Sequence, residues 1–486
     1  MKEKRNLIFI VSILTFSLVL AIYTNQSTLK DFPNSADEYS YLISAKTLSE
    51  GKISVPSPEQ KEFFDFFHII NDGKFYSKYP LGWPLFLSIG ILINFPFLIN
   101  LIFFLLTLIL IYLITKQIST EKTARTSLII ASTSPYLIFN SASYFSHPSA
   151  LFFSALSVYF YLKNINHPNK LHPIIIGLSI GILLNIRPLD AIILSIPLLI
   201  HYLFTSNKEK MKNISLALIG FSAPFILFLT YNYLQTSSPF IMPFSIYNPL
   251  DTFGFNNGYT HSFSWAIENN ILLRLIQLSI WVPLSIILIP LSLKRNKNDS
   301  RIYLFLAIIL LFILVYFFYA KEAGNQYGPR YLFSSSFAFF PLISLSINNL
   351  KYRKLVFSLI VILNILFLII FSNIISSEIN ERTYIYNYIE NNNISNAIIF
   401  LDCGLCSGKM PAKDLARNDV HFNNSVLYVN SYAENNILLM QKYPSRIFYS
   451  WHCTDIKTTY HQSIDLWQSS NIDCSLIKID QNYYKK

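Results

Sequence analysis

Residues 97–115 read FLINLIFFLLTLILIYLIT, nineteen residues without a charge. A transmembrane helix needs about 20 predominantly apolar residues to cross the hydrocarbon core, so this stretch predicts a membrane span. Hydrophobic residues make up 52% of the 486 positions and charged residues 13%, about half the charged share of an average soluble protein. We therefore expect an all-α polytopic membrane protein.

Ten further apolar runs have the length and composition of spans, which makes about eleven transmembrane helices. The predicted spans are 7–23, 97–115, 126–142, 148–162, 173–186, 191–204, 214–234, 271–293, 302–319, 331–350 and 355–371. The shorter run 81–93 is interpreted as a helix lying at the outer surface, because counting it as a span would place Lys116, Lys122 and Arg125 outside.

The basic residues gather on one side of this topology. The six short loops that would face the cytoplasm hold 18 of the 38 Lys and Arg residues but only four of the 27 acids, as the positive-inside rule expects. These loops are 1–6, 116–125, 163–170, 207–212, 294–301 and 351–354. The net charge of +11 is therefore a topology signal and argues little for nucleic-acid binding. The first span has a basic start and no small-residue cleavage site, which predicts a retained signal anchor.

Two domains are expected: a transmembrane module over residues 1–375, with outer loops 24–96 and 235–270, and an extracytoplasmic α/β domain over residues 376–486. In the second domain, short strands are predicted at 397–401, 425–429 and 446–449, with a helix at 434–442. The 235–270 loop, which carries Asp251 and His261, is long enough to be a lid or binding segment.

All four cysteines, Cys403, Cys406, Cys453 and Cys474, fall in the C-terminal domain. On the outer side of the membrane, one or two structural disulfides are expected, and three pairings are open. The Cys403-x-x-Cys406 spacing also occurs in redox and zinc sites, but a single pair of this kind is a weak signal.

The first outer loop holds the densest polar and aromatic chemistry. Asp37 and Glu38 precede an apolar period near 3.6, so they should begin an amphipathic helix, where free amides stabilise a carboxylate. Simple helix capping is the alternative. Asp72-Gly73 predicts a hairpin turn. Lys78 follows at headgroup depth, where it could anchor the chain or meet a lipid phosphate.

Other basic or polar groups lie where the predicted spans meet the outer membrane surface. The spans themselves hold almost no ionisable residues. This pattern counts against an ion pathway. Together the boundary motifs resemble those of the GT-C superfamily of membrane glycosyltransferases, specifically the family 39-like group that includes protein O-mannosyltransferases and lipid A aminoarabinose transferases, in its bacterial branch. The motifs are Asp37–Leu42, Ser77–Gly82, Ser146–Pro148, Arg187-Pro188 and Gly328–Leu332, spread over about residues 1–370.

The resemblance implies an enzyme that takes a sugar from a polyprenyl-phosphate donor at the outer leaflet and transfers it, with inversion, to a hydroxyl of a glycan, lipid or protein acceptor. It implies a bacterial inner-membrane location. Asp37 would be the general base, and Glu38 would orient the acceptor or join Asp37 in binding a divalent metal, if one is used. Lys78, Arg187 and Arg330 would bind the leaving phosphate.

The candidate substrate contacts are Tyr41, His147, Tyr327 and Tyr331. His147 stands where related transferases often place an aspartate. For the arginines the alternative role is headgroup anchoring, and for the tyrosines it is an interface belt.

Two other classes fit parts of the sequence. A lipid-sugar transporter would also be polytopic, but it should show broken or charged helices near the midplane and an internal repeat. An O-antigen polymerase or ligase would use similar donors, but it usually places its largest outer loop later and lacks an acidic pair directly after the first span.

Overall fold

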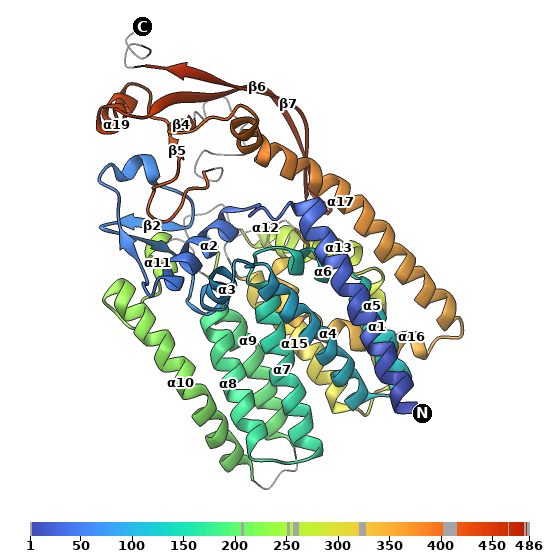
Figure 1. The fold of residues 1–486 in the computed structure, drawn as a ribbon. Helices are drawn as coiled ribbons and strands as arrows, with labels where there is room; N and C mark the ends of the chain where they lie inside the picture. The colour runs from blue at the N-terminus through green and yellow to red at the C-terminus, as the bar shows by residue number, and fades with distance from the viewer. Residues whose placement is uncertain are drawn as a thin grey trace.

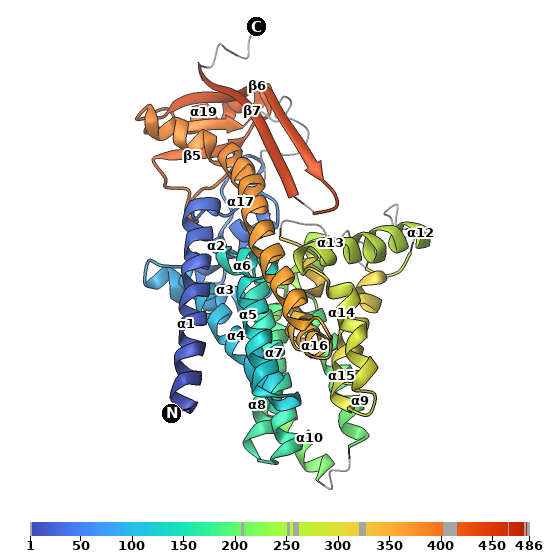
Figure 2. The same cartoon turned by 90° about the vertical axis from the view of Figure 1, so that its right-hand side faces the viewer.

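A computed structural model of the chain describes residues 2–205, 209–249, 253–255, 262–319, 327–401, 416–464, 466–480 and 483. A helical bundle forms one end, and a smaller domain with a β-sheet forms the other (Figures 1 and 2). The N-terminus lies at the end of the bundle that is remote from the sheet (Figure 1).

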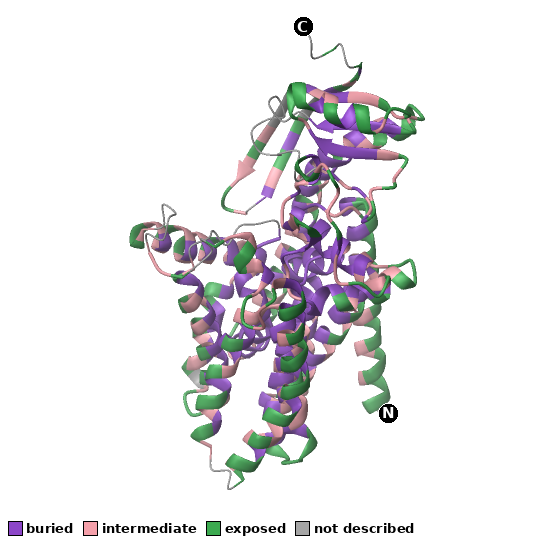
Figure 3. Ribbon diagram, turned by 90° about the vertical axis from the view of Figure 1, so that its left-hand side faces the viewer, coloured by how far each residue is buried: buried purple, intermediate pink, exposed green. Residues whose placement is uncertain are grey.

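Six of the predicted spans correspond to helical segments that are long and apolar enough, by length and composition, to cross a membrane within the described residues. They are α1 (Lys2–Tyr23) with the π-helix η1 (Thr24–Leu29), α4 (Leu98–Ile118), α10 (Lys210–Thr236), α15 (Ser300–Phe317), η5 (Arg330–Ala338) with α16 (Phe339–Asn348), and α17 (Arg353–Asn391). The apolar windows of α1 and α10 are 17% buried, whereas that of η5 and α16 is 94% buried. In Figure 3 the helix leading to the N-terminus is largely exposed, and the centre of the bundle is buried.

A seventh predicted span, 271–293, is not a straight helix. The segment α12 (Phe263–Ala266), η3 (Ile267–Leu272) and α13 (Leu273–Trp281) is bent by 94° relative to α14 (Ser285–Leu291) and η4 (Ser292–Arg295). Pro283 falls in the break and has no amide to donate, and Leu284 adopts a left-handed φ of 61°. The predicted span 271–293 therefore corresponds to a bent pair of helices that together have the length and composition of a span.

Of the four remaining predicted spans, one is divided, two form short helices, and one lies in a helix of 20 residues that is not among the apolar span candidates. The run 126–142 is divided at Pro135 into α5 (Glu121–Thr133) and α6 (Pro135–Ala142), and 148–162 lies in α7 (His147–Asn166). The helices α8 (Leu171–Ile186) and α9 (Pro188–Leu203) have 16 residues each, or about 24 Å at 1.5 Å per residue. Each alone falls short of a hydrocarbon core about 30 Å thick.

The first outer loop folds as its local signals predict. Helix α2 (Ala36–Ser49) is followed by β1 (Val55–Pro56), η2 (Lys61–Phe64), β2 (Ile69–Asp72) and β3 (Lys74–Ser77), with sheet order β1-β3-β2. The predicted hairpin turn is present, since Asp72 pairs with Lys74 across Gly73, whose φ is 72°. The run that was expected to lie at the outer surface forms the helix α3 (Gly82–Leu92), and residues of the predicted second outer loop form the short helix α11 (Pro243–Tyr247).

The C-terminal sheet has the order β5-β4-β6-β7. The predicted strands appear as β4 (Ala397–Leu401), β5 (Val426–Asn430) and the start of β6 (Ile447–His461), and the predicted helix appears as η6 (Ala433–Asn435) and α19 (Asn436–Lys442). The long strand β7 (Leu466–Ile479), antiparallel to β6, was not predicted. A disulfide joins Cys453 to Cys474 across this pair, whereas Cys403 and Cys406 lie outside the described residues.

The C-terminal sheet and the first outer loop share one hydrophobic core. Phe63, Phe64 and Phe75 of the loop are buried together with Ile398 and Phe400 of β4. The C-terminal domain therefore rests on the segment that carries Asp37, and α17 leads into it through the expected boundary at residues 375 and 376 without a break.

Candidate active site

Helix α2 begins with a side-chain cap. The hydroxyl of Ser35 accepts a hydrogen bond from the amide of Glu38 at 3.2 Å, and Ser35 and Glu38 have the spacing of a capping box. Asp37 and Glu38 both stand in the first turn, as predicted. Free amides at this turn stabilise negative charge.

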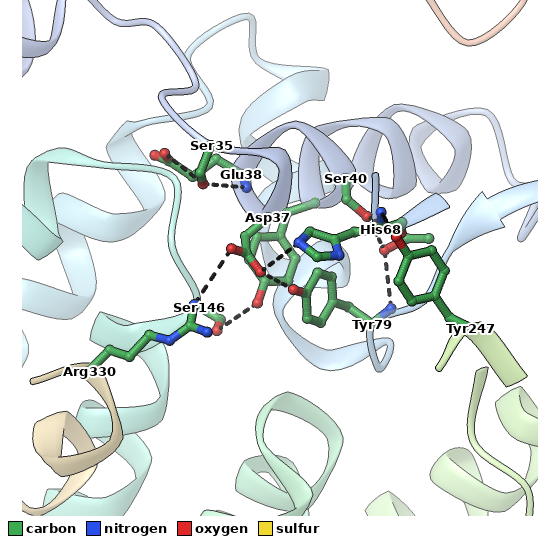
Figure 4. Close-up of polar contacts among 11 residues, drawn as sticks. Ser35, Asp37, Glu38, Ser40, His68, Tyr79, Ser146, Tyr247 and Arg330 are labelled. Carbon is green, nitrogen blue, oxygen red and sulfur yellow. Dashed lines mark hydrogen bonds and ion pairs between the residues drawn. The ribbon is translucent and has the colours of Figure 1, made fainter. Parts of the chain in front are cut away.

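The structure separates the acidic pair. Successive helical residues point about 100° apart, and Figure 4 shows Glu38 turned away from Asp37. The Glu38 carboxylate accepts from the Tyr144 amide at 2.8 Å and from the Ser35 hydroxyl at 3.2 Å. Glu38 is 1% exposed, and burial raises its pKa to about 7 despite these two hydrogen bonds. Glu38 therefore stabilises a buried turn and does not line the cavity described next.

A cavity of about 280 Å³ opens beside Asp37. Its walls come from the first outer loop, the starts of α7 and α9, the second outer loop, the end of α15 and the start of η5. The lining residues include Asp37, Tyr41, His68, Lys78, Tyr79, His147, Arg187, Phe244, Tyr316, Arg330 and Tyr331. Segments far apart in the sequence thus meet at one polar site.

Among the described residues, Tyr79, His68 and Arg330 contact the Asp37 carboxylate (Figure 4). The Tyr79 hydroxyl donates a hydrogen bond to Oδ1, His68 Nε2 lies 3.7 Å from Oδ1, and Arg330 Nη1 lies 3.5 Å from Oδ2. The Asp37 side chain is 15% exposed. Neither Tyr79 nor His68 was predicted as a site residue, although Tyr79 stands within the motif that contains Lys78.

Lys78 lies inside the site and is 2% exposed, so it is not a lysine that extends to the headgroups. Its ammonium lies 5.2 Å, 4.8 Å and 4.7 Å from the ring centroids of Tyr79, Phe244 and Tyr247. These distances are within the range of cation–π attraction. Two of the rings belong to α11, which places the second outer loop at the active-site cavity.

Arg187 is fixed by a carboxylate that the sequence analysis missed. Its Nε lies 2.6 Å from Oδ2 of Asp190, which is fully buried. Asp190 also accepts from the Tyr316 hydroxyl at 2.5 Å and from the Ser334 hydroxyl at 2.6 Å. The i,i+3 spacing of Arg187 and Asp190 on a helix start was the available signal.

Arg330 stands at the start of η5 and is bordered by aromatic rings. Its guanidinium lies 5.3 Å from the Tyr331 ring centroid, and Tyr331 stacks on Tyr316 with centroids 4.3 Å apart and an interplanar angle of 4°. The stack joins α15 to η5, and both arginines line the cavity.

The remaining predicted contacts divide into two groups. Tyr41 and His147 line the cavity; the Tyr41 hydroxyl bonds Ser146 Oγ at 3.2 Å. His147 is 3% exposed, and neither of its ring nitrogens has a hydrogen-bond partner within the described part of the chain. Tyr327, by contrast, is buried and stacks on Phe139 outside the cavity lining.

The geometry does not bring the predicted metal pair together. Asp37 and Glu38 point in different directions, and no group of three or more His, Cys, Asp or Glu side chains gathers to hold a metal ion among the described residues. These residues do not fit a divalent cation held by the acidic pair, so we derive no step through a metal.

The arrangement combines a carboxylate with a local excess of positive charge. Three cations, Lys78, Arg187 and Arg330, stand against the carboxylates of Asp37 and Asp190. Such a site can accept a proton at Asp37 and stabilise an anionic group beside it. Asp251, His261 and residues 321–326 lie outside the described residues.

Comparisons with known proteins agree with this fold. Residues 84–233 match the family model described as dolichyl-phosphate-mannose-protein mannosyltransferase. The structure is similar to ArnT from Cupriavidus metallidurans, solved in the apo state and bound to undecaprenyl phosphate. In both states the TM-score is 0.62 and the identity 9%, over 94% of this chain and 97% of that chain.

An oligosaccharyltransferase from Archaeoglobus fulgidus, solved with a tethered acceptor peptide, is also similar. Its TM-score is 0.51 and its identity 12%, over 91% of this chain and 69% of that chain. A search of curated proteins by sequence finds no match. These similarities show that the chain shares the fold of ArnT, one of the lipid A aminoarabinose transferases to whose group the sequence resemblance pointed.

Proposed function

We propose that this chain, whose fold is that of the GT-C membrane glycosyltransferases, moves a sugar from a polyprenyl-phosphate-linked donor to an acceptor hydroxyl at the outer face of the membrane, with inversion. One observation carries the proposal: a single cavity brings the Asp37 carboxylate together with Lys78, Arg187 and Arg330. A base for the acceptor and cations for a phosphate leaving group are the two requirements of this reaction.

Asp37 is the general base in this proposal. It takes the proton of the acceptor hydroxyl while the acceptor oxygen attacks the anomeric carbon from the face opposite the phosphate. A base must come within about 3 Å of the proton donor, and Asp37 lines the cavity where an acceptor would lie. Its place in the first turn of α2 stabilises the ionised form.

The three cations stabilise the departing lipid phosphate, on which negative charge grows as the glycosidic bond breaks. Arginine offers paired donors to phosphate oxygens, and lysine offers a point charge. The undecaprenyl phosphate bound by ArnT supports a lipid phosphate as the ligand class. Tyr41, His147 and Tyr331 line the same cavity, and we assign them to contacts with the sugar or the acceptor.

The decisive experiment measures transfer of labelled sugar from a panel of polyprenyl-phosphate donors to membrane extracts. We compare the native chain with D37N, which keeps the size of the side chain and removes the base. General-base catalysis contributes about 10²–10⁴-fold, so D37N should lose at least a hundredfold in rate. The variant E38Q is the matched control and should retain transfer, because Glu38 lies outside the cavity.

A D37N chain as active as the native one would overturn the role of Asp37. Absence of transfer by the native chain with every donor and acceptor would overturn the transferase proposal and favour a transporter or a polymerase.

Donor binding tests the cations separately. The variants K78Q, R187Q and R330Q should each weaken binding of a polyprenyl-phosphate donor about 10–100-fold, since a hydrogen bond to a charged group contributes about 1.5–3 kcal/mol. K61Q is the matched control, because Lys61 is exposed and pairs with Asp72 away from the cavity. Unchanged donor affinity in all three variants would remove these residues from the phosphate site.

A further inference from the structure

His68 is held in an unusual conformation beside Asp37. Its φ is 64°, in the left-handed region that non-glycine residues rarely adopt. The backbone around it is fixed by three hydrogen bonds: its carbonyl accepts from Ser40 Oγ at 2.8 Å and from the Lys78 amide at 3.0 Å, and its amide donates to the Tyr247 hydroxyl at 3.0 Å. A strained backbone conformation of this kind is retained where several surrounding contacts hold it in place, often at functional sites.

The imidazole of His68 faces the base of the proposed reaction (Figure 4). Nε2 lies 3.7 Å from Asp37 Oδ1, which is longer than a hydrogen bond. Catalytic hydrogen bonds are often this long without substrate and shorten when substrate binds. The His68 side chain is 24% exposed and that of Asp37 is 15% exposed. A proton that moves from Asp37 to His68 therefore moves to a more solvent-accessible group.

We propose, on the basis of the proposed function, that His68 receives a proton from Asp37. This is the proton that Asp37 has taken from the acceptor hydroxyl. The acceptor O–H bond breaks and the oxygen forms the new glycosidic bond, while the bond from the anomeric carbon to the phosphate oxygen breaks and its electron pair leaves with the lipid phosphate. The proton goes to Asp37, then to Nε2 of His68, and from Nε2 to water, because Nδ1 is buried. Asp37 is again a carboxylate for the next turnover.

The chemistry of the neighbouring groups favours His68 for this step. Of the three side chains that contact Asp37 in Figure 4, the guanidinium of Arg330 is a donor that does not titrate, and the Tyr79 hydroxyl already donates to the carboxylate. Imidazole alone among them both accepts and releases a proton near neutral pH.

Aromatic rings and cations of the site border the imidazole of His68. The ring of His68 packs edge-on against Tyr79 and Tyr247 with centroids 5.8 Å and 5.7 Å apart. The Lys78 ammonium lies over the same two tyrosine rings, and Arg330 faces the other carboxylate oxygen. The imidazole and the cations of the site are therefore linked through the same aromatic rings.

The test uses the full chain and the substitutions H68N and H68G, which both tolerate a positive φ. We measure kcat and the donor KM from pH 6 to pH 9. H68N should lower kcat at least tenfold with the donor KM within twofold, and the dependence of kcat on a group titrating near neutral pH should disappear. Added imidazole should raise kcat of H68G at least fivefold and leave D37N inactive.

His421 provides the matched control, because it pairs with Glu50 outside the cavity; H421N should keep the native kcat and pH profile. Native kcat and an unchanged pH profile in H68N, in a preparation where D37N is inactive, would overturn the relay and leave the proposed function intact. Failure of imidazole to restore H68G would also overturn it. Inactivity of the native chain would instead overturn the proposed function.

Discussion

Two neighbouring carboxylates, Asp37 and Glu38, have different environments although one peptide bond joins them. Asp37 faces the cavity and three polar or cationic side chains, whereas Glu38 is enclosed between Ser35 and Tyr144. The sequence predicted that both begin a helix, which Ser35 capping confirms. It could not predict which of them faces the cavity, because Glu38 is turned toward Tyr144, 106 residues away.

The same limit explains the other site residues. Lys78, Arg187 and Arg330 were predicted because each stands in a short motif at the end of an apolar run. His68 has no such local pattern, and its place beside Asp37 arises from contacts with Ser40, Lys78 and Tyr247. These partners lie on three separate elements, so their convergence is a property of the tertiary fold.

Glu38 supplies a prediction on the pH dependence of stability. Burial raises its pKa from 4.5 to about 7, so between these values the unfolded chain has lost the proton and the folded chain still holds it. Stability therefore falls as pH rises through this window, by about 3 kcal/mol at most. The variant E38Q does not titrate, and its melting temperature relative to the native chain should rise from pH 5 to pH 8.

Thermal unfolding in the same detergent at both pH values measures this difference. E62Q is the control, since Glu62 is an exposed acid of the same loop, and its difference from the native chain should stay constant. A difference for E38Q that is equal at pH 5 and pH 8 would show that Glu38 does not titrate as its burial requires.

At the scale of elements, helices were predictable where apolarity is continuous, and breaks and long strands were not. Pro283 and Pro135 interrupt runs that were predicted as single spans. The two prolines were visible in the sequence, but the spans were predicted from apolar composition alone. Strand β7 mixes polar and apolar residues without clean alternation, and it is specified by pairing with β6 and by the Cys453–Cys474 disulfide. Pairing partners of this kind are not encoded in a local pattern.

The packing of α8 against α10 depends on two glycines. Gly177 of α8 faces the backbone of α10, and Gly220 of α10 faces the backbone of α8. A Cβ at Gly177 would lie 1.8 Å from the Ala217 carbonyl oxygen, and one at Gly220 would lie 2.0 Å from the Ile174 carbonyl oxygen. Small residues permit such close approach of membrane helices. Either G177A or G220A must separate the helices, and overpacking of this kind typically costs about 1–3 kcal/mol.

We expect each variant to lower the melting temperature of the protein in detergent, and the double variant to lower it further. L178A is the control, because Leu178 is exposed on the same helix and its truncation leaves the crossing unchanged. Native melting temperatures in both glycine variants would mean that α8 and α10 do not approach this closely.

At the scale of the whole molecule, the basic loops collect at one end and the sheet at the other (Figure 1). Arg125 Nε donates to Asn6 Oδ1 at 3.0 Å, and Arg301 Nη1 donates to the Gln117 carbonyl at 2.8 Å. These contacts join the N-terminal end to the predicted cytoplasmic loops 116–125 and 294–301. The cavity beside Asp37 lies nearer the C-terminal domain, because the first outer loop packs against that domain.

This polarity makes a prediction about orientation in the membrane. Positive loops remain in the cytoplasm, so a reporter fused after Lys116 should be cytoplasmic. Helix α17 has 39 residues from Arg353 to Asn391, about 58 Å at 1.5 Å per residue, whereas a span needs about 20 residues. Asn380 therefore lies beyond the span, and a reporter fused there should be extracytoplasmic. Paired phosphatase and fluorescent-protein fusions at both points measure this, and the reverse result at either point would place the cavity on the wrong side for an outer-leaflet donor.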